Sequence, residues 1–208
     1  LVIDAPQQTV CIESVEQFGL RVPSALFLVE LSAGSALEES DEEAKESLIE
    51  AAKESRDILA DFVSNNASNI PLLYADGIVA LAEGNYAVAT SKLEKVLYNN
   101  PKPSSLQYRY AAIGLAETGS NGLAVDRLAK AIVADPTKLS NYVLKARLEL
   151  KMKNYDMASR TLSKLPLKAK SVPQVSELLD MIAMGRTSST ESVFTDETLA
   201  FIAKAEKL

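Results

Sequence analysis

The sequence predicts an all-α protein, a right-handed α-solenoid of helical hairpins, on three observations. Small residues recur at intervals of 35 and then 34 positions, at Ala89, Ala124 and Ala158, and this period is typical of stacked helix-turn-helix units. Aromatic residues make up only 6% of the chain, which favours helices packed through small side chains. No alternating Val/Ile/Thr segments are joined by Asn-Gly or Asp-Gly turns, so strands are at most local.

The composition of the chain argues against several classes of function. The chain has 208 residues, 47% of them apolar, which is enough for one substantial domain or an elongated repeat array. A net charge of −6 argues against a general nucleic-acid binder, which needs a basic face. The chain has no histidine, so the commonest general base and metal ligand are missing, and we expect no cofactor or metal site. Cys11 is the single cysteine and cannot form an internal disulfide.

The N-terminal third is expected to be helical but carries no repeat motif. Residues 1–22 are interpreted as an arm followed by a short helix that ends at Gly19. Residues 23–69 have the length of one further, degenerate helical pair. Its first helix is expected from Pro23, which suits a first helical turn, to about Leu31, with Gly34 as a breaker.

The second helix of this pair is expected to be long and acidic. Ser40 and Glu43 form the pattern of a capping box, which predicts a helix from about Asp41 to Ser64. Its outer sides carry many carboxylates. A run of charge such as this is usually a solvated face, and the alternative is docking on a basic partner through long-range attraction.

Residues 70–170 are predicted to form three repeat units, and residues 171–208 to form capping helices. Ser171 and Gln174 make a second capping-box pattern, and Thr195 is expected to cap a final amphipathic helix that seals the open end of the stack. No apolar run approaches about 18 residues, so no membrane span is expected. The six repeat helices are expected at about 71–83, 86–99, 104–118, 121–134, 138–152 and 155–165.

The residues between these helices carry a resemblance to a known family. Gly84 and Gly119 stand at the turns, where a positive φ favours glycine. Tyr86 opens a second helix, and Pro101 follows it. This pattern resembles the tetratricopeptide repeat (TPR), although Lys153 stands at the third turn. The small residues at the family's two close-approach positions are Gly77 and Ala89, Ala112 and Ala124, and Ala146 and Ala158.

The resemblance implies a non-catalytic scaffold or adaptor for protein-protein interaction, whose partner is a protein or peptide. In this family the first helix of each pair lines a concave groove. An extended or helical peptide with apolar anchors suits such a groove, with a carboxylate held by Arg109 or Arg147. The alternative is that these side chains only pack against neighbouring helices. The groove positions carried over are Tyr74, Ile78, Leu81, Arg109, Tyr110, Ile113, Val143, Arg147 and Leu150.

Two other functions remain open at this stage. The chain is a fixed structural subunit of a larger multiprotein assembly, docked through its convex face and its ends, or it is an enzyme. Residues 11–14 and 21–30 resemble the opening helices of lytic transglycosylases, which implies Glu30 as the acid carboxyl that cleaves peptidoglycan. Leu31 replaces the serine that follows this Glu in the family, and the downstream Gly-x-Met-Gln segment is absent. Exported or periplasmic and cytoplasmic locations are both compatible with the sequence.

Overall fold

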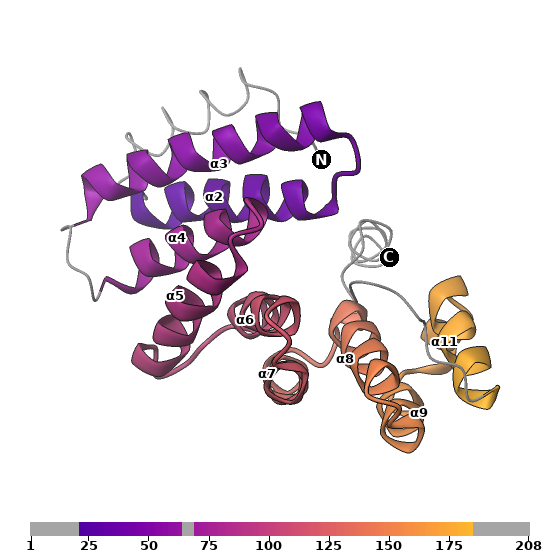
Figure 1. Cartoon of the computed structure of the whole chain (residues 1–208). Helices are drawn as coiled ribbons and strands as arrows, with labels where there is room; N and C mark the ends of the chain where they lie inside the picture. Colours follow the sequence, from indigo (N-terminus) through magenta and orange to yellow (C-terminus); the bar gives the residue numbers. More distant parts are fainter. Residues whose placement is uncertain (1–20, 64–68, 185–208) are drawn as a thin grey trace. The chain divides into compact units, whose positions relative to one another are not determined.

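Every regular element in the computed structural model of this chain is a helix, within the described residues 21–63 and 69–184 (Figure 1). The predicted all-α class with paired helices is confirmed. The chain divides into two compact units, Leu1–Pro101 and Lys102–Leu208. A single repeat block over 70–170 stays a prediction. The helices predicted before Gly19 and after Thr195 lie outside the described residues.

The first unit contains four described helices, α2 (Arg21–Glu38), α3 (Glu42–Phe62), α4 (Ile70–Ala82) and α5 (Tyr86–Asn99). Helix α2 packs on α3 and on α4, and α4 also packs on α3 and forms a hairpin with α5. Nearly every side chain of α4 is buried, from Leu72 to Ala82. This helix is apolar on all sides, as expected for an element enclosed by its neighbours.

Helix α2 corrects one prediction. It continues through Gly34 and Ser35, which the sequence analysis took as a break. Ala33, Ala36 and Leu37 around that point are buried. A glycine costs a helix about 1 kcal/mol, and packing against α3 and α4 outweighs this local preference.

Helix caps also differ from those predicted. The N-cap of α3 is Asp41, whose Oδ1 accepts a hydrogen bond from the Ala44 amide at 2.9 Å, so the Ser40 capping box was wrong by one residue. A true capping box occurs instead at Ser104 and Gln107, where the sequence analysis expected none. Short polar residues compete for the same amides, and the chain path decides which of them is in reach.

The second unit consists of two long hairpins and a terminal pair in its described part. Helix α6 (Ser105–Glu117) pairs with α7 (Asn121–Ala134), and α8 (Leu139–Lys151) pairs with α9 (Tyr155–Ser163). Helix α7 also packs on α8, while α11 (Pro173–Ala183) packs on α8 and α9. The short α10 (Leu167–Lys170) was not predicted. Helix α11 begins after Val172 without a side-chain cap, so the Ser171 and Gln174 box was also wrong.

The repeated small residues are the close-approach positions of the hairpins. Ala89, Ala124 and Ala158 are each 0% exposed. A Cβ added at Gly77 would lie 2.8 Å from two side-chain atoms of Leu93, so α4 and α5 approach one another over a residue that has no side chain. The packing reason for the repeat is therefore confirmed.

The three hairpins use the same turn. Gly84 and Gly119 have φ values of 75° and 82°, and Lys153 takes the equivalent place at 61°. In each turn the amide three positions after the last residue of the first helix donates a hydrogen bond to the carbonyl five residues before it. The three bonds are Asn85 to Ala80 at 2.7 Å, Ser120 to Leu115 at 2.7 Å and Asn154 to Glu149 at 2.8 Å. This left-handed cap satisfies helix carbonyls whether or not glycine is present.

Candidate functional site

The predicted groove positions of the first unit lie in its interior. Tyr74, Ile78 and Leu81 on α4 are 2%, 0% and 0% exposed. Helix α2 packs along this helix, and the Tyr74 hydroxyl donates a hydrogen bond to the Glu30 carboxylate. These side chains therefore contribute to the packing of α4 in the structure as it stands.

Three predicted positions lie on α6 in the second unit, and they too are buried. Arg109, Tyr110 and Ile113 are 5%, 6% and 3% exposed. The Arg109 guanidinium donates to Ser140 Oγ on α8 at 2.8 Å and lies 5.6 Å from the Tyr110 ring centroid. A buried cation held by a hydroxyl and an aromatic face joins two helices.

The last three positions lie on α8. Val143 and Leu150 belong to the core cluster that α8 forms with α9 and α11, together with Leu162 and Leu178. Arg147 is half-buried and is the most accessible of the nine predicted residues. The structure thus brings three of the nine together on α4 and six on α6 and α8, and their action as one groove stays a prediction.

Glu30, the catalytic candidate of the transglycosylase alternative, is a half-buried residue of α2 whose carboxylate accepts the Tyr74 hydrogen bond. Cys11 lies outside the described residues. Across residues 21–63 and 69–184, no three side chains of the His, Cys, Asp and Glu types group as metal ligands would. None of the helices described here combines the length and the apolar character that a membrane crossing requires.

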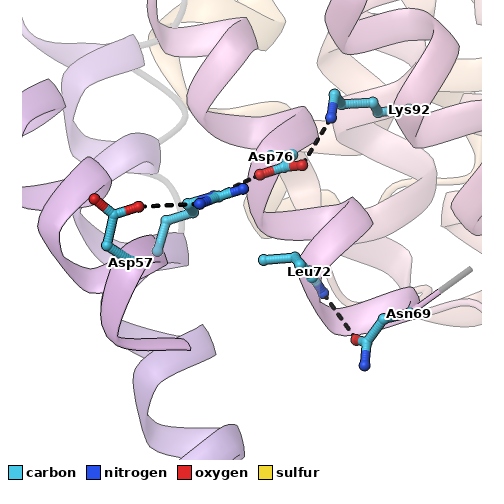
Figure 2. A network of polar contacts seen from close by, with 6 residues as sticks. Asp57, Asn69, Leu72, Asp76 and Lys92 are labelled. Carbon is cyan, nitrogen blue, oxygen red and sulfur yellow. Dashed lines mark hydrogen bonds and ion pairs between the residues drawn. The ribbon is translucent and has the colours of Figure 1, made fainter. Parts of the chain in front are cut away.

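A carboxylate joins three helices of the first unit. Asp76 on α4 accepts from Arg56 Nε on α3 at 2.6 Å and from Lys92 Nζ on α5 at 2.7 Å (Figure 2). Burial raises the pKa of Asp76, but the hydrogen bonds from Arg56 and Lys92 outweigh it, and the net pKa lies below the ordinary value of 3.8. Asp76 therefore links α4 to both α3 and α5 through ion pairs, and sequence spacing alone did not indicate this role.

A second buried network fastens α8 to α9. Lys145 donates to Glu149 Oε1 and, at 2.9 Å, to Thr161 Oγ1, while Thr161 donates to Glu149 Oε2 at 2.7 Å. Glu149 is 1% exposed, so its carboxylate is compensated inside the hairpin by its contacts with Lys145 and Thr161. The closed arrangement links α8 to α9 inside the hairpin.

The outward sides of the second helices were missed by the sequence analysis. Val88, Leu123 and Met157 are 41%, 53% and 46% exposed. They stand immediately before the three buried alanines, so they occupy one position of the repeat. A second repeat position is more exposed still, with Tyr98 at 90%, Val133 at 82% and Leu167 at 84%. The 35- and 34-residue spacing relates the residues within each of these two sets, so it could have identified them from the sequence.

Comparisons with known proteins add little to this picture. No protein-family model and no curated protein matches the chain. Among solved structures it is similar to one described as "Crystal structure of YrrB: a TPR protein with an unusual peptide-binding site". The identity is 14%, the TM-score is 0.49, and the match covers 95% of this chain and 98% of that chain. Similarity at this level carries no argument about function, which must come from the chain's own residues.

Proposed function

We propose that this chain is a non-catalytic scaffold for protein-protein interaction. The observation that carries the proposal is the repetition itself: three hairpins share a buried small residue, one turn geometry and one exposed apolar position on their second helices, at Val88, Leu123 and Met157. In a repeat protein each hairpin contacts only its neighbours, so its outer surfaces stay available to partners.

The concave groove predicted from the sequence is one way to hold such a partner. Arg147 is the least buried of the nine predicted groove residues, and its guanidinium is the charge that a peptide carboxylate beside α8 would approach. Arg109 is engaged with Ser140 inside the unit, and therefore contributes to a groove only by positioning α6 against α8.

A fixed place in a larger assembly is the second candidate. Two sets of exposed apolar residues at equivalent repeat positions favour it: Val88, Leu123 and Met157, and Tyr98, Val133 and Leu167. Apolar side chains exposed at a repeated position resemble an interface more than the isolated apolar residues of an ordinary surface.

The test is cross-linking and affinity purification of the tagged chain from its native source, followed by mass spectrometry. We expect a specific protein partner in stoichiometric amount. Arg147→Ala removes this partner if the groove holds it, and leaves it bound if the outward sides of the second helices do. A native chain that behaves as a monomer with no cross-linked protein contradicts the scaffold proposal. Release of peptidoglycan fragments that depends on Glu30 in a Glu30→Gln comparison overturns the non-catalytic assignment.

A further inference from the structure

The outward side of α7 carries a narrow stripe of four residues. Leu123, Asp126, Lys130 and Val133 follow one another at spacings of three, four and three positions. Residues spaced in this way lie on one side of a helix, opposite the buried Ala124, Leu128 and Ala131. All four stripe residues are exposed.

The same stripe recurs at the equivalent positions of the other two repeats. On α5 it reads Val88, Ser91, Lys95 and Tyr98. In the third repeat Met157 and Arg160 lie on α9 and Lys164 is its C-cap, while Leu167, the sequence equivalent of Val133, begins α10 after the extended Pro166. Of the nine large apolar side chains exposed in the described ranges, six stand at the two ends of these stripes. Isolated exposed apolar residues need no explanation, but apolar ends retained in three repeats do.

The third position of the stripe is lysine in every repeat. Lys95, Lys130 and Lys164 are exposed, and within residues 21–63 and 69–184 the structure pairs none of them with a carboxylate. Asp126 stands one turn before Lys130 on α7 and forms no ion pair with it in that described part. An accessible cation at the same position of each repeat, on a chain of net charge −6, is complementary to a negatively charged partner.

We propose that these stripes on the second helices dock an amphipathic helix of another protein, whose apolar side is flanked by carboxylates. This rests on the scaffold function proposed above and gives the chemistry of the partner. The two apolar ends of the α7 stripe are ten residues apart, which is about 15 Å along a helix. An antiparallel or parallel partner helix with apolar residues about three turns apart matches both ends and places a carboxylate against the central lysine.

A helix fits this surface better than the other partners of a repeat protein. The flank of an α-helix has its backbone groups satisfied internally, so an extended strand gains no main-chain hydrogen bonds there. An anionic membrane surface is recognised by clusters of about four to eight basic residues. Each stripe holds only one or two basic residues, namely Lys95, Lys130 beside Asp126, and Arg160 with Lys164, which suits pairing with individual carboxylates.

The test uses three synthetic helical peptides with the same leucine spacing and with Glu, Gln or Lys at the flanking positions. Their binding to the full chain is measured by fluorescence anisotropy. We expect the Glu peptide to bind best and the Lys peptide worst. Replacing all three stripe lysines (Lys95→Glu, Lys130→Glu, Lys164→Glu) should weaken the Glu peptide at least tenfold and reverse the order. Replacing the apolar ends (Tyr98→Ser, Val133→Ser, Leu167→Ser) should weaken all three peptides.

The matched control carries Phe27→Ser and Met184→Ser. These two side chains lie outside the stripes and are 58% and 63% exposed, so this variant should bind the peptides like the parent. Circular dichroism melts establish that every variant is folded. No binding by any peptide, no preference for the Glu peptide or an unchanged order in the lysine variant overturns the inference. So does binding of the parent to phosphatidylserine vesicles in preference to the Glu peptide, or loss of self-association as the only effect of the stripe variants.

The native purification separates this inference from the scaffold function on which it rests. A native partner that is retained by both stripe variants refutes the stripe and leaves the scaffold function standing. The absence of any native partner from the parent chain itself refutes the scaffold function.

Discussion

Gly77→Ala tests whether the small residues of the repeat are present for packing. The added Cβ would lie 2.8 Å from both Cγ and Cδ2 of Leu93, closer than carbon atoms pack in proteins. Leu93 is 1% exposed and has little room to move away. We therefore expect α4 and α5 to be forced apart, or Leu93 to leave its preferred rotamer.

The expected magnitude follows from two opposing effects. Overpacking a filled core costs about 1–3 kcal/mol. Alanine in place of glycine within a helix gains about 0.5–1 kcal/mol. The variant should therefore lose roughly 1 kcal/mol, because the difference between these two ranges runs from about 0 to about 2.5 kcal/mol.

The matched control is Gly122→Ala in α7, where nothing lies within 4 Å of the added Cβ. It should be neutral or stabilising by up to about 1 kcal/mol, because only the helix preference changes. Urea unfolding followed by circular dichroism measures both, and hydrogen exchange localises the effect of Gly77→Ala to α4 and α5. A Gly77→Ala chain at least as stable as the parent would refute the close-packing explanation of the repeat.

Three further outcomes follow from polar groups and turns. Asp76→Asn should lower the free energy of unfolding in urea by about 1–3 kcal/mol. Because the pKa of Asp76 is lowered in the folded chain, its stabilisation is complete well above pH 3.8 and is lost as the pH falls below that value. The variant should not show this loss at low pH. Glu149→Gln leaves the Lys145 charge buried with a weaker partner and should lower the free energy of unfolding by about 3 kcal/mol, whereas a change near zero would contradict a buried ion pair. Lys153→Gly should stabilise by about 0.5–1 kcal/mol through relief of a left-handed backbone, while Gly119→Lys should destabilise by about 1 kcal/mol. Equal melting temperatures for the parent and both variants would contradict the positive φ values at these turns.

The repeat was predictable because its determinants are local and recur. Ala89, Ala124 and Ala158 are small for one reason, and Gly84 and Gly119 end first helices for another, so each repeat restates the same two requirements. Helix bounds in 70–163 consequently agreed with expectation to within a residue or two. The conformation of Lys153 shows that the turn survives where its usual residue is missing, since the surrounding helices fix the geometry.

The repeat spacing could not predict that eight of the nine groove residues are buried. Family positions identify which side of a first helix faces a groove, but they do not say what covers it. In this chain Tyr74 hydrogen-bonds to Glu30 of α2, an element with no repeat motif, and Val143 packs into a cluster with α9 and α11. Contacts between elements far apart in sequence decided the outcome, as they did when α2 continued through Gly34.

The exposed stripes, in contrast, could have been predicted, because the repeat spacing that relates their residues was already recognised in the sequence. Leu123 and Val133 lie within the helix predicted over 121–134, and the sequence analysis assigned them no role. On a helical wheel Ala124, Leu128 and Ala131 already complete one inner side, so apolar residues at the outward positions are surplus to the core. Surplus apolar residues at the same two positions of three repeats, with a lysine between them each time, are difficult to attribute to folding. They are better explained by contacts made outside the chain, and Val133 and Leu123 on α7, which are 82% and 53% exposed, provide a surface for those contacts.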